Sequence, residues 1–100
     1  GNSMRVISRR PLKELAQRYP EAKAELAAWF HEAEAAHWAN PAKIKAQYGN
    51  ASILKGSRVV FNICGNKYRL VVKINYAYEI VYVRFAGTHR EYDRVKAEDI

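Results

Sequence analysis

Two runs of strand-forming residues on either side of a Gly-Asn pair constrain the fold most strongly. Residues 59–64 read VVFNIC and residues 67–76 read KYRLVVKINY, and both runs are rich in β-branched and aromatic side chains. Gly65-Asn66 suits a two-residue hairpin turn because both residue types tolerate a positive φ. The pattern therefore predicts an antiparallel hairpin in which Asn62 faces Arg69.

This hairpin has one apolar and one basic face, because successive side chains of a strand point to opposite faces. The apolar face collects Val59, Phe61, Ile63, Tyr68, Leu70, Val72 and Ile74. The basic face collects Arg58, Val60, Asn62, Lys67, Arg69, Val71 and Lys73. We therefore expect the apolar face to pack in a core and the basic face to bind a negatively charged group.

A third strand is predicted over residues 79–86 (EIVYVRFA), after a turn at residues 77–78. The expected register sets Leu70 opposite Phe85 and Val71 opposite Arg84. It adds Val81, Val83 and Phe85 to the apolar face, and Tyr82 and Arg84 to the basic face. A slip of one residue would bury a charged guanidinium, so we expect this register to be well specified.

Helices are predicted before the strands. After a short strand at residues 4–8, Pro11 suits the first position of a helix that Pro20 interrupts. A longer helix is predicted from about residue 21 to residue 39, with an apolar stripe at helical spacing formed by Leu26, Trp29, Phe30, Ala33 and His37. Alanine is abundant there, which favours helix.

Shorter elements follow the long helix. Asn40-Pro41 is typical of a helix start, and Gly49 of the position after a helix end. Residues 50–56 are expected to be a loop, and a final helical turn is expected from Thr88. We therefore predict an α+β fold: a small antiparallel sheet, N-terminal helices packed on its apolar face, a short C-terminal helix, and an open basic face.

Length and charge limit the possible functions. The chain has 100 residues, 49% of them hydrophobic, which suits one folded domain over residues 4–100 and argues against disorder. The first three residues, Gly1-Asn2-Ser3, are interpreted as an expression scar. The net charge of +7 indicates an acidic partner such as nucleic acid.

Several classes of protein are not indicated. No apolar run is long enough to span a membrane, and no signal peptide is visible. Cys64 is the one cysteine, so no internal disulfide is possible and a reduced, cytoplasmic setting is expected. The spacing of His and Cys residues fits no metal site, and there is no nucleotide-binding glycine loop. We therefore expect neither a metal nor a cofactor.

The basic face contains a candidate phosphate site. Arg69 and Arg84 are expected near each other on neighbouring strands, with Asn62 beside them. Like charges placed side by side cost stability, and an anion between them would relieve that cost. Guanidinium groups suit phosphate oxygens. For Lys67 and Lys73 the simpler interpretation is a solvated surface that adds salt-dependent affinity.

The segment after the last strand adds candidates. Thr88 and Glu91 form the spacing of a capping box, which is a complete structural explanation for both. His89 is either an ordinary surface histidine or a proton-transfer group, since it follows shortly after Arg84. Tyr92 is expected to stack on a base, act as an acid, or pack against the sheet.

A family resemblance lies in the order of elements and in two segments, VFNICGNKYRLV at residues 60–71 and YVRFAGTHREYD at residues 82–93. In these features the chain resembles the HigB toxins of the RelE-like superfamily. The resemblance implies a toxin–antitoxin mRNA interferase, an endoribonuclease that generally acts on the translating ribosome. It also implies an antitoxin with a helix-turn-helix domain, and binding to operator DNA only through the antitoxin complex.

Residue roles also follow from the resemblance. Arg69 matches the phosphate-binding arginine of RelE-like toxins, and Asn62 falls where RelE has a lysine. His89 falls where RelE has a second arginine, and Tyr92 is the nearest match to a catalytic tyrosine. The implied reaction is metal-independent, with Arg69 and Arg84 stabilising the phosphorane. The alternatives are a non-catalytic RNA-binding module and a toxin of the same fold directed at a topoisomerase.

Overall fold

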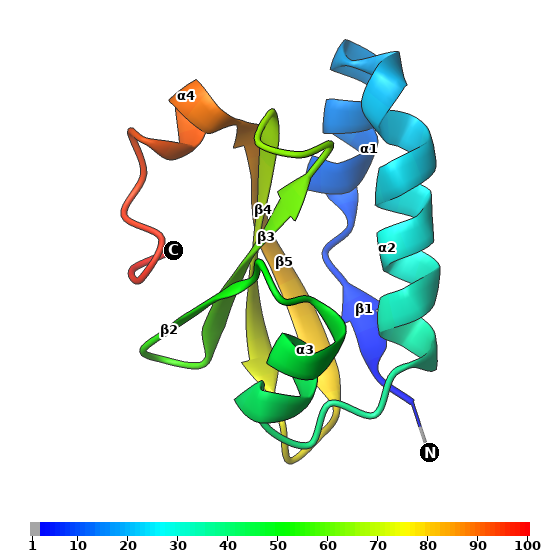
Figure 1. The fold of residues 1–100 in the computed structure, drawn as a ribbon, viewed down its shortest axis with the longest axis vertical. Helices are drawn as coiled ribbons and strands as arrows, with labels where there is room; N and C mark the ends of the chain where they lie inside the picture. Colours follow the sequence, from blue (N-terminus) through cyan, green and yellow to red (C-terminus); the bar gives the residue numbers. More distant parts are fainter. Residues whose placement is uncertain (1–2) are drawn as a thin grey trace.

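The computed structural model describes residues 3–100 and shows an α+β fold, as the sequence predicts. Gly1 and Asn2, where the predicted expression scar begins, lie outside the described residues. The elements are β1 (Arg5–Ile7), α1 (Arg10–Arg18), a 3₁₀ turn (Pro20–Ala22), α2 (Lys23–Ala35), α3 (Pro41–Gln47), β2 (Ser52–Leu54), β3 (Arg58–Ile63), β4 (Tyr68–Asn75), β5 (Ile80–Thr88) and α4 (His89–Tyr92). Figure 1 shows α1 and α2 on one side of the sheet, with α4 and the C-terminus on the other.

The sheet has five strands in the order β1-β5-β4-β3-β2. Strands β2 to β5 are antiparallel neighbours, while β1 pairs parallel to β5 at one edge. The expected loop over residues 50–56 is wrong in part, because Ser52 to Leu54 pair with β3. This strand has no alternating pattern of its own, and it forms because the edge of β3 offers backbone partners.

The helix starts are largely as predicted, and the end of the long helix is not. Pro11 lies in the first turn of α1, and the side chain of Asn40 accepts a 3.1 Å hydrogen bond from Lys43 N at the start of α3. The predicted helix over residues 21–39 begins with a 3₁₀ turn and ends at Ala35. Ala36 has extended backbone, and its carbonyl accepts a hydrogen bond from Met4 N. His37 is therefore exposed and does not lie on the core stripe.

The β3–β4 hairpin has the predicted register, including the pair Asn62 and Arg69. The predicted two-residue turn at Gly65-Asn66 is wrong in detail, because residues 64–67 form the loop and the positive φ values are at Cys64 (53°) and Gly65 (68°) and not at Asn66. The parity of the hairpin is preserved, so the apolar and basic faces of these two strands are the predicted ones.

The β4–β5 register is as predicted from the turn up to the pair Val72 and Val83, and wrong beyond it. A β-bulge inserts Arg84 as an extra residue, so Val71 faces Phe85 and Leu70 faces Ala86. Phe85 therefore joins the face predicted to be basic. Arg84 remains exposed on that face and does not face Val71.

The helical side of the sheet is the main core. Phe61 lies at its centre, 1% exposed, with its ring centroid 5.4 Å from that of Trp29 and 5.9 Å from that of Trp38. Leu70 and Val72 are completely buried beside it. Trp29 is thus a core residue, as expected, Trp38 is another, and Phe30 is partly buried. This packing leaves the other face of β3, β4 and β5 as the surface on which a site can form.

Candidate functional site

The sheet face opposite the main core is built from three rungs that cross β3, β4 and β5. The hairpin-end rung contains Asn62, Arg69 and Gly87, the middle rung contains Val60, Val71 and Phe85, and the far rung contains Arg58, Lys73 and Tyr82. The middle rung is apolar, whereas the two outer rungs carry the positive charge. Arg84 is the bulged residue between the middle and far rungs.

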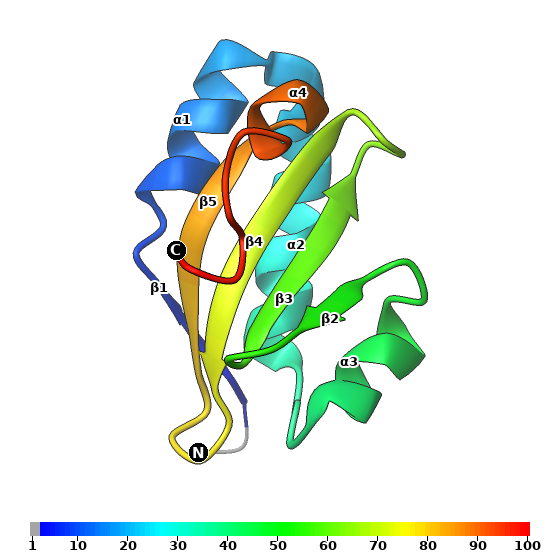
Figure 2. The same ribbon diagram turned by 90° about the vertical axis from the view of Figure 1, so that its left-hand side faces the viewer.

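The C-terminal segment, residues 93–100, covers the middle rung (Figure 2). Val60 and Val71 are 3% and 0% exposed and pack with Ala97 of this segment. Arg58 Nε donates a 2.8 Å hydrogen bond to Ile100 O. The expectation of a fully open basic face is therefore wrong, because apolar side chains at its centre favour a covering segment over water.

This arrangement separates the two arginines that were expected to be neighbours. Arg69 pairs with Gly87, three positions along β5 from Arg84, which corresponds to a separation of about 10 Å along the strand. Arg69 Nη1 donates to Asn66 O at 3.1 Å and to Tyr68 O at 3.3 Å, which holds the guanidinium beside the hairpin turn. The structure thus brings Arg69 together with Asn62, and Arg84 together with the far rung.

Helix α4 starts beside the hairpin-end rung. The predicted capping box is present: Thr88 Oγ1 accepts a 3.1 Å hydrogen bond from Glu91 N, and Thr88 N donates a 2.8 Å bond to Glu91 Oε1. His89 N donates to Lys67 O at 2.9 Å, which ties the first residue of α4 to the loop of the β3–β4 hairpin. His89 therefore lies at the same end of the sheet as Arg69.

The His89 side chain is half exposed and has one charged partner. Its Nδ1 atom lies 3.3 Å from Asp93 Oδ2. The contact orients the imidazole and leaves Nε2 as the ring nitrogen for another partner. The sequence analysis did not identify Asp93, although its position four residues after His89 in a helical segment was the available signal.

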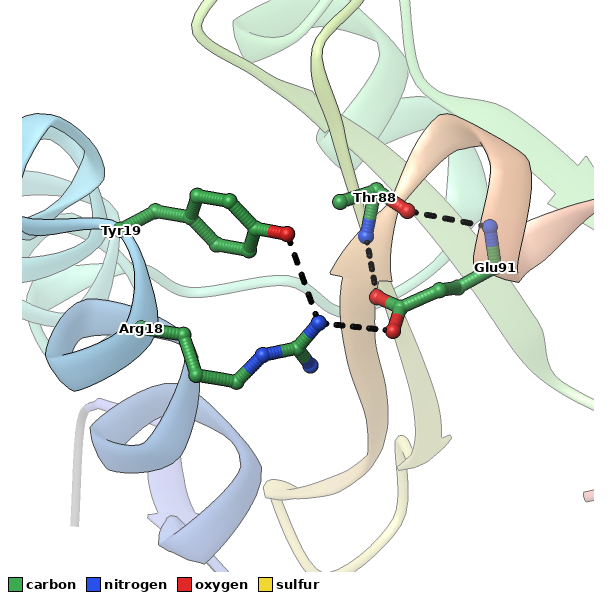
Figure 3. A network of polar contacts seen from close by, with 4 residues as sticks. All are labelled: Arg18, Tyr19, Thr88 and Glu91. Atoms are coloured by element: carbon green, nitrogen blue, oxygen red, sulfur yellow. Dashed lines mark hydrogen bonds and ion pairs between the residues drawn. The ribbon is translucent and has the colours of Figure 1, made fainter.

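Helix α4 is anchored from the other side of the sheet by Arg18 (Figure 3). Arg18 Nη2 donates a 2.8 Å hydrogen bond to Glu91 Oε2, and a longer one of 3.5 Å to Tyr19 Oη. The Arg18 guanidinium, and after it the Thr88 N–H, hold the pKa of the Glu91 carboxyl below its usual value. Nothing in the sequence pattern identified Arg18, which occupies the last turn of an ordinary amphipathic helix.

Lys67 is directed toward the helical layer. Its Nζ atom lies 3.0 Å from Glu21 Oε2, and the other carboxylate oxygen of Glu21 accepts a 2.8 Å hydrogen bond from Tyr68 Oη. The Lys67 contact, followed by that of Tyr68, lowers the pKa of Glu21. The structure therefore does not bring the Lys67 ammonium to Arg69, although both residues flank the same turn.

Tyr92 packs against the middle rung. Its ring centroid lies 6.5 Å from that of Phe85, and it belongs to the apolar cluster around Val60 and Val71. Of the three interpretations open for this residue, packing is the one with a contact to support it. Tyr92 thereby fixes the end of α4.

Residues 3–100 contain neither a cluster of metal-ligating side chains nor a helix that could span a membrane. No group of three or more His, Cys, Asp and Glu side chains gathers in this part of the chain in a way that would hold a metal ion. None of its helices has the length and apolar character needed to cross a membrane.

Comparison with known proteins gives consistent matches. The family model for the HigB toxin, described as the RelE-like toxic component of a toxin–antitoxin system, matches residues 22–95. The mRNA interferase toxin HigB of Escherichia coli (strain K12) is 32% identical over 92 residues, which cover 90% of this chain and 88% of that protein. An mRNA interferase HigB of Escherichia coli O6:H1 is 24% identical over 94 residues, covering 92% and 91% of the two chains. The chain therefore belongs to the HigB toxin family, the RelE-like toxic components of toxin–antitoxin systems.

Proposed function

We propose that this chain is an mRNA interferase, an endoribonuclease that cuts mRNA without a metal ion. Its membership of the HigB toxin family supports this function, as do relatives that are named mRNA interferases. The net charge of +7 provides the general affinity for a polyanion that such an enzyme needs.

The observation that carries the proposal is the arrangement at the hairpin end. Arg69 pairs with Asn62 on one side and with Gly87 on the other, and His89 follows Gly87 by two residues. No ion pair between side chains of residues 3–100 involves Arg69, so its guanidinium keeps its capacity for a phosphate. A phosphate-binding group and a proton-transfer group therefore lie at one end of the sheet.

The reaction needs a positioned phosphate and two proton transfers. The ribose 2′-oxygen attacks phosphorus while the bond to the 5′-oxygen breaks, which leaves a 2′,3′-cyclic phosphate and a 5′-hydroxyl. Arg69 stabilises the charge that develops on the phosphoryl oxygens, and Asn62 positions the phosphate. His89 serves as general acid or base, with Asp93 orienting its ring. Tyr92 acts as a positioning residue, since its packing fixes α4.

The setting and the partners follow from the same proposal. The substrate is mRNA on the translating ribosome in the cytoplasm, where exposed lysines and arginines also contact ribosomal RNA. An antitoxin with a helix-turn-helix domain neutralises the toxin, and operator DNA is bound only through that complex. Membership of a toxin–antitoxin family supports the existence of an antitoxin.

The test is primer extension on a defined mRNA in a bacterial cell-free translation system, with and without ribosomes. Arg69→Ala is compared with Arg10→Ala, because Arg10 is an exposed arginine on α1, away from the site. We expect discrete new 5′ ends with the wild type and with Arg10→Ala. With Arg69→Ala we expect a loss of about 100-fold or more, because removing one donor to a transition-state oxyanion typically costs that much.

Each result has a defined meaning. Cuts that need both translation and Arg69 support the whole proposal. Cuts on naked RNA would support the nuclease activity and contradict its dependence on the ribosome. Full activity of a folded Arg69→Ala variant would remove this site from the mechanism. Absence of any cleavage would favour a non-catalytic RNA-binding module, or a toxin that acts on a protein such as a topoisomerase.

A further inference from the structure

The far rung lines a pocket that the proposed cleavage chemistry does not use. The pocket has a volume of about 600 Å³. Its charged and aromatic lining residues include Arg58, Lys73, Tyr82, Arg84 and Asp99. Its rung residues Arg58, Lys73 and Tyr82 share the sheet face of Arg69 and lie two rungs away from it along the strands.

The positive charges in this pocket come from three different strands. Arg58 and Lys73 face each other directly across β3 and β4, and Arg84 projects from the bulge in β5. None of the side-chain ion pairs in the described part of the chain involves these three residues. Asp99 contributes one negative charge to the lining, so the three cations leave a net positive charge that a bound anion would offset.

One of the three cations is fixed in place by the backbone. Arg58 donates from Nε to Ile100 O at 2.8 Å and from Nη1 to Gly56 O at 3.1 Å. Two of its donors are thereby engaged and the side chain is held at the pocket wall. Because the side chain is already held in place, it loses less conformational entropy when an anion binds. Lys73 and Arg84 are exposed and remain free to close on a ligand.

We propose that this pocket binds a second phosphate of the RNA substrate, with Tyr82 offering its ring to the attached base; this rests on the proposed function. Lys73 is four positions along β4 from Arg69, which places the pocket about 13 Å from the cleavage site. A tyrosine among cations is the combination that single-stranded RNA uses, through stacking and phosphate contacts.

The covering segment between the two sites carries exposed charges of both signs, with carboxylates at Asp93, Glu98 and Asp99. Arg94 and Lys96 are exposed on it. A single strand that runs from Arg69 to the pocket therefore gains its phosphate contacts at the two sites and not along this segment. The consequence is that longer RNA binds more tightly than a dinucleotide that reaches only the cleavage site.

The test measures binding of RNA that cannot be cut. The probe is a fluorescent decanucleotide of 2′-O-methyl RNA, which lacks the nucleophile, and its anisotropy is followed at several salt concentrations. The double variant Lys73→Gln/Arg84→Gln is compared with Lys13→Gln/Arg10→Gln, which removes the same charge from exposed residues of α1. All four residues are exposed, so thermal unfolding is expected to stay near that of the wild type.

We expect the pocket variant to bind the decanucleotide about tenfold or more weakly, and its plot of log affinity against log salt to be less steep by about 0.7, the value for one lost phosphate contact. The α1 variant is expected to stay within about twofold of the wild type, since charges distant from the ligand are screened. Equal losses in the two double variants would overturn the inference, because net charge alone would then explain them.

Two further comparisons distinguish failure of the pocket inference from failure of the proposed cleavage function, and RNA binding from binding of an acidic peptide. If the wild type cuts no RNA but binding still depends on Lys73 and Arg84, the cleavage function fails and the RNA pocket stands. If it cuts RNA and the pocket variant binds normally, the pocket inference fails alone. Decaglutamate that binds as tightly as the RNA, with the same dependence on Lys73, would also overturn it, since the pocket would then suit acidic protein segments.

Discussion

Arg18 Nη2 lies 2.8 Å from Glu91 Oε2, so the end of α1 holds α4 even though the two helices lie on opposite sides of the sheet. The same carboxylate accepts the Thr88 N–H, which completes the capping box of α4. The position of His89 at the start of α4 thus depends on a side chain from the helical layer. A substitution in α1 is therefore expected to alter the candidate site without touching it.

Glu91→Gln tests this link through pH. Glutamine keeps the capping box but removes the charge that Arg18 contacts. Because the folded protein lowers the Glu91 pKa, the stabilisation is present above the unfolded value of about 4.3 and is lost as pH falls through the lower folded value. We therefore expect the variant to be less stable than the wild type at neutral pH, and the gap to close in acid.

Thermal unfolding of the two proteins across this pH range measures the gap. Glu14→Gln, at an exposed position of α1, is the control and should run parallel to the wild type. A gap between Glu91→Gln and wild type that stays constant with pH would mean that the carboxylate does not carry the effect.

His89→Gln is expected to lower the cleavage rate about 100-fold while changing RNA affinity little, because general acid–base catalysis typically contributes that much. Glutamine keeps a polar side chain but cannot transfer a proton near neutral pH. The check is single-turnover cleavage at saturating RNA, together with binding of the uncleavable decanucleotide. His31→Gln on α2 is the matched control, and equal rates for the two variants would remove His89 from the mechanism.

Gly87→Ala is expected to destabilise the protein by about 1–3 kcal/mol, the usual cost of overpacking. A Cβ atom at this position would lie 2.7 Å from Glu91 Oε1 and 2.7 Å from the Phe85 ring. Urea unfolding measures the loss. Gly49→Ala is the control, because a Cβ there meets no atom within 4 Å. Equal stability of the two variants would show that α4 shifts to make room for the added Cβ without loss of stability.

Ala97→Asp is expected to release the C-terminal segment from the middle rung. Ala97 is 7% exposed against Val60 and Val71, and an unpaired carboxylate is poorly tolerated in such a site. Limited proteolysis followed by mass spectrometry should show faster cleavage after Tyr92, while the main core stays protected. Glu98→Ala, on the same segment but exposed, should be cut like the wild type. Unchanged protection of the Ala97→Asp segment would contradict the covering role given to it.

The β3–β4 hairpin was predictable because its information is local. A turn that accepts positive φ and an uninterrupted alternation of side chains together fix its register. The capping box at Thr88 and the cap at Asn40 are local in the same way, and both are present. These features determined which strand residues lie opposite the core, including Asn62 and Arg69.

The features that sequence reasoning missed depend on distant contacts. The bulge at Arg84 lets Phe85 join Val60 and Val71 beneath the C-terminal segment, an apolar contact that no alternation rule within β5 reports. The helix α2 ends early because Ala36 O accepts a hydrogen bond from N of Met4, the residue before β1. The early end of α2 and the exposure of His37 follow from one long-range hydrogen bond, which outweighs the helix propensity of alanine.

The parallel pairing of β1 with β5 also governs when the fold can form. The contacting residues Arg18 and Glu91 are 73 residues apart in the sequence. Strand β1 likewise pairs with a strand near the end of the chain. During synthesis, α1 and α2 emerge well before the strands that they cover, and such non-local pairing is intrinsically slow. A translation product that stops before β5 lacks the partner of β1 and the whole of α4. Incomplete synthesis would therefore release a chain that lacks both the β1–β5 edge of the sheet and the candidate site beside α4.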